Sequence, residues 1–330
     1  MKAFEFASPT SETEVLEILA ESRHAEVLAG GTDLVGLMKK MLVTPDRVVS
    51  LDDVPSLRVL EGTSEGLRIG AMVTLEELLD SGLLEPFAAL RQAIEAIRSQ
   101  QLLAQGTIGG ELCQRPRCWY FRAGQGLLAR GGKLVEEGDN RYHAIFGNAG
   151  AAKFVNPSRL APALIVLGAR LRIIGPNSGD ELLLPLSHAQ FFRTPYRSDD
   201  REIILEPGQI ITHIDVPITP GTTSAHYEVQ HGSGPDYPLA AAAARLRVVN
   251  EIVREARIVM GQVAPLPWCC GDAERAIIGK PVTIETAEAA GAVAVESATP
   301  LSGNRYKVQL AKVAVKRAIL LAAGLPTGGF

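Results

Sequence analysis

Short stretches in which apolar and polar residues alternate recur along the chain, and amphipathic stretches with a helical period lie between them. Near the N-terminus, this alternation predicts strands over residues 2–6, 25–28 and 47–51. A helix is predicted after Ser11, which forms a capping box with Glu14, and another is predicted over 34–42. We interpret residues 1 to about 55 as a first subdomain.

The middle of the chain continues this mixed pattern. Strands are predicted over 67–72, 171–174, 182–186 and 209–216, and helices over 85–100 and 160–167. Thr74 and Glu77 form a second capping box. Residues 105–110 and 122–150 are expected to be loops, because glycines interrupt any regular period. Pro220 and Gly221 mark a boundary within 218–222, so a second subdomain is expected over about 56–218.

In the C-terminal part, a run of predicted strands precedes a run of predicted helices. Strands over 225–230, 240–249 and 251–263 form a meander with a turn near Asn250 and Glu251. Helices are predicted over 272–278, 283–297 and 306–323. This order predicts a C-terminal α+β domain over 223–330 with an antiparallel sheet.

Charge and composition exclude several classes of function. The 330 residues include 33 Lys and Arg against 37 Asp and Glu, a net charge of −4, so there is no basic surplus for nucleic acid. No apolar stretch reaches the ~18 residues of a membrane span, and the N-terminus lacks the pattern of a secretory leader. Four cysteines are too few for a disulfide scaffold. A cytoplasmic location is expected, with export to the periplasm on a partner's signal as the alternative.

Two glycine-bearing turns are the strongest candidates for chemistry. In the first, a strand ending in Leu28 and Ala29 is followed by Gly30 and Gly31, and a helix opens with Thr32, Asp33 and Leu34. The second comprises Thr107, Ile108, Gly109 and Gly110. Glycines let the backbone approach an anion closely, although a simple helix N-cap explains the first turn equally well. Together they favour a dinucleotide whose diphosphate is held from both sides by main-chain amides.

These turns and several later motifs resemble one family. Residues 29–34 and 107–110 are similar to the two pyrophosphate loops of the FAD-binding (medium) subunits of molybdenum hydroxylases, the xanthine dehydrogenase and carbon monoxide dehydrogenase group. Residues 69–75, 157–164, 261–268 and 304–308 match further motifs in the same order. Residues 117–122 and 140–145 resemble the branch of aldehyde oxidoreductase and hydroxybenzoyl-CoA reductase type, which carries an extra four-iron cluster.

The resemblance implies a fold and a role. The fold is α+β, with a two-subdomain FAD-binding domain of the PCMH and vanillyl-alcohol oxidase type before the C-terminal domain. FAD is implied in this chain, molybdopterin in a large partner subunit and [2Fe-2S] clusters in a small one, with FAD as the outlet to an external electron acceptor. The implied cofactor-binding residues are those of the two turns together with Glu111 and, by their place in family motifs, Ile97 and Ser158. No catalytic or metal-binding residue is expected.

The chain departs from the family at several cofactor positions. Only Cys113 and Cys118 lie in the loop that holds four cysteines in the cluster-bearing branch, so a four-iron cluster is not expected here. Glu111 replaces the usual Asn, Arg159 replaces an Asp, and Val229 is the nearest match to a family lysine near the flavin. Arg159 is expected to offset Glu111 or to pair with it. The alternative function is therefore a flavin-free structural subunit that keeps the fold to dock its partners.

Three other features are assigned structural roles. Trp119, Tyr120 and Phe121 are expected in the core, with a partner surface as the alternative. His143 is interpreted as a histidine with satisfied hydrogen bonds. Lys307, at the start of the last helix, is interpreted as a solvated charge.

Overall fold

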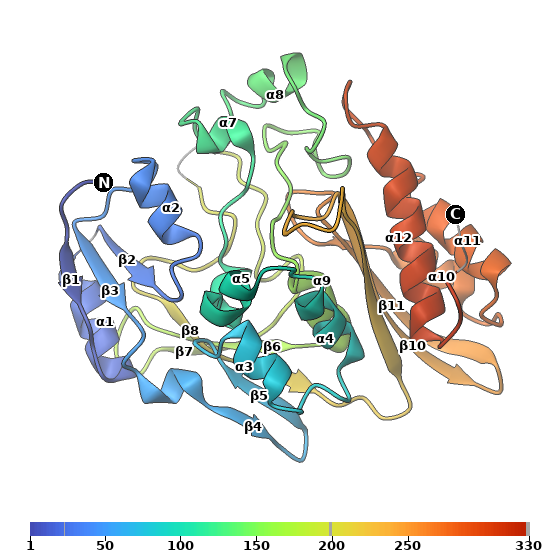
Figure 1. Ribbon diagram of the computed structural model, residues 1–330, viewed down its shortest axis with the longest axis horizontal. Helices are drawn as coiled ribbons and strands as arrows, with labels where there is room; N and C mark the ends of the chain where they lie inside the picture. Colours follow the sequence, from blue (N-terminus) through green and yellow to red (C-terminus); the bar gives the residue numbers. More distant parts are fainter. Residues whose placement is uncertain (23, 198–199, 328–330) are drawn as a thin grey trace.

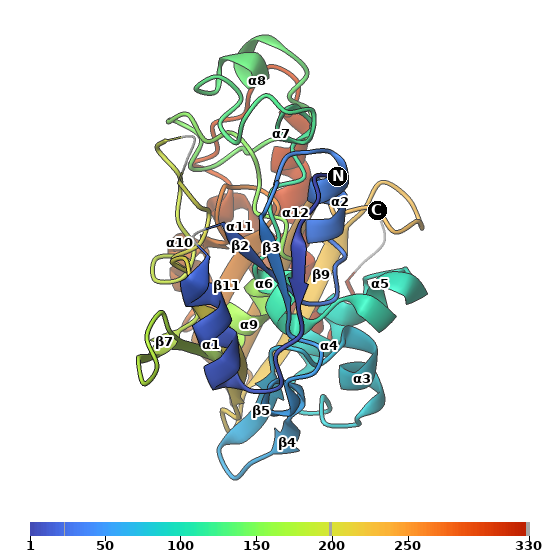
Figure 2. The same cartoon turned by 90° about the vertical axis from the view of Figure 1, so that its left-hand side faces the viewer.

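A parallel three-stranded sheet forms the N-terminal end of the computed structural model, which describes residues 1–22, 24–197 and 200–327 (Figure 1, Figure 2). The last three residues of the expected 223–330 domain thus lie outside the described part. The strands lie in the order β1 (Glu5–Ala7), β3 (Arg47–Ser50) and β2 (Ala25–Leu28). Helix α1 (Glu12–Glu21) begins where Ser11 Oγ accepts from Glu14 N. Helix α2 (Leu34–Lys39) follows β2 almost directly, so the first glycine turn joins a strand to a helix.

A five-stranded antiparallel sheet forms the middle of the molecule. Its order is β4 (Leu60–Gly62), β5 (Gly66–Gly70), β8 (Ile210–Pro217), β6 (Arg170–Ile174) and β7 (Glu181–Pro185). The short 3-10 helix η1 (Pro55–Arg58) leads into it. One large apolar core joins the sheet to the helices α3 (Leu75–Asp80), α4 (Ala88–Glu95), α5 (Gln100–Gln105), α6 (Ile108–Leu112) and α9 (Ala161–Leu167).

The C-terminal part is a four-stranded antiparallel sheet covered by helices. Its order is β12 (Trp268–Cys269), β11 (Ile252–Gly261), β10 (Ala240–Val249) and β9 (Thr223–Val229), and its helices are α10 (Gly271–Ile277), α11 (Ile284–Ala294) and α12 (Tyr306–Ala322). The alanines at 240–244 are fully buried. Ala240, Ala242 and Ala244 belong to the core under α12, and Ala243 belongs to the core that reaches α9. Small side chains therefore let helices approach both faces of β10 closely.

A long irregular segment joins the two halves of the chain. Residues 113–155 carry only the short helices α7 (Trp119–Arg122) and α8 (Lys133–Glu137), and they lie between α2 and α12 at the top of Figure 1. Asn140 anchors the segment to the loop before α12, because its side chain donates to Ser302 Oγ (2.9 Å) and accepts from Gly303 N (2.7 Å).

Three local expectations from the sequence are wrong. The helix expected over 85–100 is shorter, because it ends at Glu95 and Ser99 caps a new helix, α5. The loop expected over 105–110 contains the start of α6, since Thr107 Oγ1 accepts from Gly110 N and caps a helix that runs through both glycines. Lys307 is not a solvated charge but is 1% exposed on α12.

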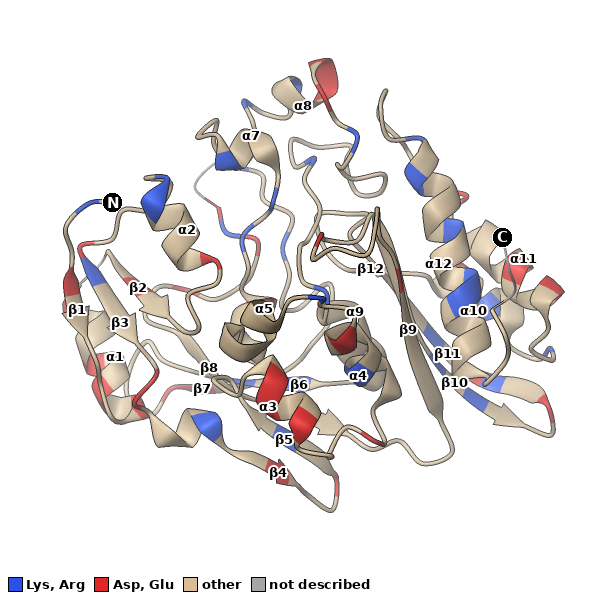
Figure 3. Cartoon of the chain, viewed as in Figure 1, with Lys and Arg blue, Asp and Glu red and all other residues tan. Residues whose placement is uncertain are grey.

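Charged residues of both signs are spread over all three sheets and their helices (Figure 3). Among the described residues, no helix combines the length and the apolar character that crossing a membrane requires.

Candidate functional site

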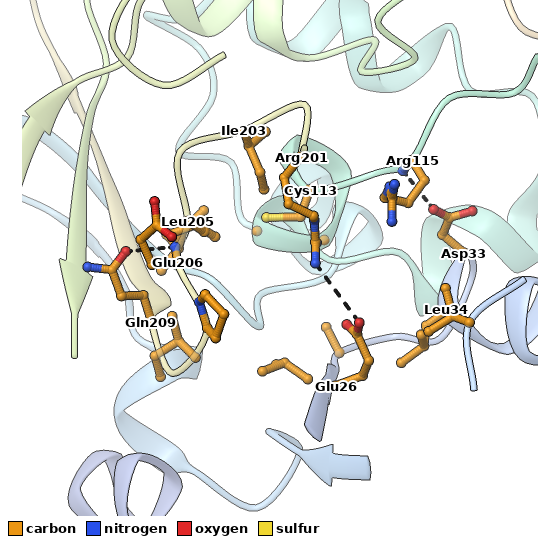
Figure 4. Close-up of a pocket in the computed structure, with 18 of the residues that line it drawn as sticks. Glu26, Asp33, Leu34, Cys113, Arg115, Arg201, Ile203, Leu205, Glu206 and Gln209 are labelled. Carbon is orange, nitrogen blue, oxygen red and sulfur yellow. Dashed lines mark hydrogen bonds and ion pairs between the residues drawn. The ribbon is translucent and has the colours of Figure 1, made fainter. Parts of the chain in front are cut away.

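A cavity of about 1190 Å³ lies where the first glycine turn faces the second. Its walls come from β2, α2, the start of α6 and residues within 188–196 and 200–211 (Figure 4). Ligand cavities in proteins commonly enclose 300–1,000 Å³. The volume is therefore sufficient for a molecule as large as a dinucleotide.

Each glycine of the first turn has a physical reason to lack a side chain. A Cβ on Gly30 would lie 1.5 Å from the carbonyl oxygen of Gln105, so the chain approaches that backbone too closely for any other residue. Gly31 has a φ of +72°, in the left-handed region that favours glycine. The two residues thus set the direction in which the following amides point.

The first turn offers a row of unused hydrogen-bond donors. The main-chain N–H groups of residues 30–34 donate to no acceptor in the described part of the chain, whereas Val35 N already donates to Gly31 O. Successive free amides in such a turn form a concave anion-binding nest. Thr32 adds an exposed hydroxyl beside them.

The second turn differs from our expectation that its amides also face an anion. Ile108 N donates to Val73 O (3.0 Å), Gly109 N to Ala71 O (3.0 Å) and Gly110 N to Thr107 Oγ1 (3.1 Å). These groups are already satisfied by the capped helix and the neighbouring chain. The second turn therefore supplies a close, side-chain-free wall and the Thr107 hydroxyl, but not a second nest.

The structure brings together nine of the fourteen implied cofactor-binding residues and leaves five away from the cavity. The nine that line it are Ala29, Gly30, Gly31, Thr32, Asp33, Leu34, Thr107, Gly109 and Gly110. The other five are Leu28, Ile97, Ile108, Glu111 and Ser158. Ile97 and Ile108 belong to the apolar core, and Ser158 Oγ accepts from Ala161 N at the start of α9.

Asp33 fixes the irregular segment against the first turn. Its Oδ1 accepts from Arg122 Nη2 (2.8 Å) and lies 3.2 Å from Arg117 Nη1, while its Oδ2 accepts from Arg115 N (2.8 Å). The carboxylate is 14% exposed, so these contacts are largely shielded from water. Asp33 thus serves the site by positioning the chain around it.

Glu111 does not pair with the Arg159 guanidinium as expected. Its carboxylate accepts instead from Arg159 N (2.8 Å) and from Gln114 Nε2. Burial raises the pKa of Glu111 to about 7, against the lowering effect of the hydrogen bond from Arg159 N and of the Arg159 and Arg117 charges. The Arg159 guanidinium donates instead to the Glu228 carboxylate, from Nη2 to Oε2 (2.5 Å) and from Nε to Oε1 (3.1 Å). Glu111 does not line the cavity, so its carboxylate is set back from a diphosphate bound there.

Three arginines in the cavity wall were not among the residues implied by the sequence. Arg115 pairs with Glu202 (2.9 Å), Arg193 with Glu206 (3.7 Å) and Arg201 with Glu26 (3.9 Å). The pair of Arg201 and Glu26 spans the cavity in Figure 4. Its partners are 175 positions apart, so local sequence carried no signal for it. Each of these arginines is paired with a carboxylate, so the three pairs add guanidinium groups but no net positive charge around the nest.

Cys113 and Cys118 have different surroundings in the fold. Cys113 lines the cavity, where burial raises its pKa to about 12, and Cys118 Sγ lies 3.1 Å from His143 Nε2. Within residues 1–22, 24–197 and 200–327, no three or more His, Cys, Asp or Glu side chains form a group that could hold a metal ion.

Comparison with known families decides the class of protein. Residues 2–219 match the FAD binding domain in molybdopterin dehydrogenase, and residues 225–322 match the CO dehydrogenase flavoprotein C-terminal domain. The chain therefore belongs to the family of proteins that contain the FAD binding domain in molybdopterin dehydrogenase. The family resemblance and the fold class expected from the sequence are thereby confirmed.

Relatives and solved structures agree with this assignment over nearly the full length. The chain is 28% identical to the aldehyde oxidoreductase FAD-binding subunit PaoB of Escherichia coli, covering 94% of this chain and 96% of the relative. It is 26% identical to the carbon monoxide dehydrogenase medium chain of Hydrogenophaga pseudoflava, with 96% of each covered. The structure of quinoline 2-oxidoreductase from Pseudomonas putida 86 superposes with a TM-score of 0.76 at 25% identity, covering 98% and 99% of the two chains.

The residues present fit the adenine dinucleotide that this family implies. The nest at residues 30–34 suits a diphosphate, the glycines leave space for it, and the cavity has sufficient volume. The fit rests on the first turn more than on the second.

Proposed function

We propose that this chain is the FAD-binding electron-transfer subunit of a molybdenum hydroxylase complex of the aldehyde oxidoreductase and xanthine dehydrogenase type. It works with a large molybdopterin-binding subunit and a small iron–sulfur subunit, and it delivers their electrons to an external acceptor. The observation that carries the proposal is the row of free amides at residues 30–34, facing a cavity of about 1190 Å³ in a chain of this family.

The chain's own residues bind and orient the cofactor. The free amides of the first turn would hold the diphosphate, with the Thr32 hydroxyl beside them as a further donor. Gly109 and Gly110 form the opposite wall, and Arg115 and Arg201, each paired with a carboxylate, also line the cavity. Bound FAD supplies the two-electron and one-electron chemistry that links the partner's clusters to the acceptor. We retain 1–218 and 223–330 as the proposed domains, with two subdomains that meet near residue 55.

A second candidate is the flavin-free structural subunit. The observations that favour it are the engaged amides of the second turn and the Arg159–Glu228 ion pair, which fills a family cofactor position with a buried contact. Such a chain would keep its fold only to hold the other two subunits together.

Flavin titration separates the two candidates. The full chain, freed of any bound flavin, is mixed with FAD and followed by flavin fluorescence and by absorbance near ~450 nm. The proposed function expects saturation at about one FAD per chain, and weaker binding of FMN, which lacks the diphosphate. If no flavin binds to a folded chain or to its complex, the structural role replaces the electron-transfer role.

A further inference from the structure

A second, smaller cavity lies beside the irregular segment. It encloses about 270 Å³ between α7, the loop before α9, the β9–β10 connection and the start of α12. Its lining shares no residue with the larger cavity.

Unsatisfied polar atoms gather in this lining. Six buried side-chain atoms in the described part of the chain have no hydrogen-bond partner, and three of them belong to lining residues: Arg117 Nε, His143 Nδ1 and Gln262 Oε1. His143 and Gln262 are each 2% exposed. Buried polar groups in native proteins are normally paired, so this concentration in one cavity indicates a missing polar partner.

A buried amine in the same lining lacks a counter-charge. Lys307 Nζ donates to the carbonyl oxygens of Tyr142 (3.2 Å), His143 (3.1 Å) and Gln262 (2.8 Å). No carboxylate in the described chain pairs with it, and burial lowers its pKa to about 7. Buried cations are usually offset by an anion. The lining's one carboxylate, Asp236, belongs to an exposed residue.

The orientation of the His143 ring adds a donor. Cys118 Sγ lies 3.1 Å from His143 Nε2, and burial raises the pKa of this thiol, which therefore remains protonated and donates to Nε2. The ring proton is then assigned to Nδ1, the unpartnered atom. Arg117 Nε and His143 Nδ1 thus both donate, whereas Gln262 Oε1 accepts.

Most of the other lining residues are aromatic or apolar, and the exposed residues His231 and Asp236 are the polar exceptions. The aromatic residues and prolines among them are Trp119, Tyr142, Phe154, Tyr237, Pro157 and Pro238. A dry cavity of about 150 Å³ accommodates benzene in other proteins, so about 270 Å³ suits one substituted ring. Flat aromatic walls favour a planar ligand.

We propose that this cavity binds a small aromatic carboxylate that also carries a hydrogen-bond donor. The carboxylate supplies the missing counter-charge of Lys307 and accepts from Arg117 Nε and His143 Nδ1. The ring packs among the aromatic walls, and the donor pairs with Gln262 Oε1. This site is distinct from the proposed flavin site.

Titration of the full chain with 4-hydroxybenzoate, benzoate and phenol tests the proposal. Calorimetry gives the affinity, and quenching of Trp119 reports occupancy in a Trp268→Phe background, since the chain has two tryptophans. We expect 4-hydroxybenzoate to bind at one site per chain, with benzoate and phenol each at least tenfold weaker. Absence of saturable binding, or equal affinity for all three, overturns the proposal.

Two variants identify the site. Lys307→Met should lower the affinity for 4-hydroxybenzoate at least tenfold. The control Lys280→Met, at an exposed position, should leave this affinity unchanged. Val155→Phe, which fills the cavity from one wall, should abolish binding and leave the FAD content unchanged. Undiminished binding in both folded variants contradicts the proposed site. Loss of FAD from folded Val155→Phe also contradicts it, because the cavity would then belong to the flavin site.

Discussion

The Arg159 guanidinium and the Glu228 carboxylate form a bidentate ion pair with N–O distances of 2.5 Å and 3.1 Å. Their side chains are 4% and 3% exposed. Arg159 belongs to the region that matches the FAD-binding domain, and Glu228 to the region that matches the C-terminal domain. The pair therefore fixes the two regions against each other, and His226 Nε2, 3.2 Å from Glu228 Oε1, supports it.

Removing one charge of this pair should destabilise the protein strongly. Glu228→Gln leaves the Arg159 cation buried without its partner, at an expected cost of about 3–5 kcal/mol in the free energy of unfolding. Denaturant unfolding followed by circular dichroism measures it. The control is Glu255→Gln, which breaks the exposed pair with Arg247 and should cost about 1 kcal/mol or less. Equal losses in the two variants would contradict a structural role for the pair.

The glycine at the centre of the first turn should be required for flavin binding. Gly31→Ala places a Cβ 3.2 Å from Val35 Cγ2 at a φ of +72°, which displaces the amides of the nest. We expect the flavin content per chain to fall at least tenfold. Gly82→Ala is a matched control, because Gly82 has a φ of +71° and open space around it, away from the cavity. Both variants should lose about 1–2 kcal/mol of stability, but only the first should lose flavin.

Asp33 should hold residues 113–122 in place. Asp33→Asn leaves the largely buried Arg122 guanidinium without a carboxylate, which should cost about 2–4 kcal/mol and loosen the segment. Limited proteolysis should then cut this segment faster than in the unmodified chain. Asp46→Asn, which breaks an exposed pair with Lys2, is the control and should leave the cleavage pattern unchanged. Identical patterns for both variants would rule out this role.

The buried Lys307 should give stability a specific dependence on pH. Its pKa is lowered to about 7 in the folded state from 10.5, so the unfolded chain binds more protons between these values, and stability rises with pH across that window. Relative to Lys307→Met, the unmodified chain should gain on the order of 3 kcal/mol between pH 7 and about pH 10, at ~1.4 kcal/mol per pH unit. Unfolding midpoints at several pH values measure this difference. If the stability of the unmodified chain and of Lys307→Met changes with pH in the same way, the amine is solvated. The control Lys280→Met should show the same pH dependence as the unmodified chain.

Elements with strong local signals could be predicted from the sequence. The capping box at Thr74 and Glu77 forms in full, the strand at 240–249 has the predicted limits, and the turn at Asn250 and Glu251 has both residues at positive φ. Each of these signals lies within a few neighbouring residues, where propensity and periodicity act.

What could not be predicted depends on contacts between distant segments. The amides of the second turn are satisfied by Ala71 and Val73, more than 30 positions earlier, so the motif alone could not show that they are used. Arg159 pairs with Glu228, which lies 69 positions further along the chain. Lys307 is buried because the first turn of α12 packs against residues 142–143 and 262, which the amphipathic pattern of one helix does not reveal.

Arg117 lines the smaller cavity and also pairs with Asp33, which lines the larger one. Its Nη1 lies 3.2 Å from Asp33 beside the nest, its Nε is among the unsatisfied atoms of the smaller cavity, and its guanidinium lies 5.0 Å from the centre of the Tyr237 ring. A ligand in one cavity that draws the Arg117 guanidinium toward itself alters the electrostatic environment of the other cavity. By reciprocity, any influence of an aromatic acid on flavin affinity must be matched by an equal influence of flavin on the acid.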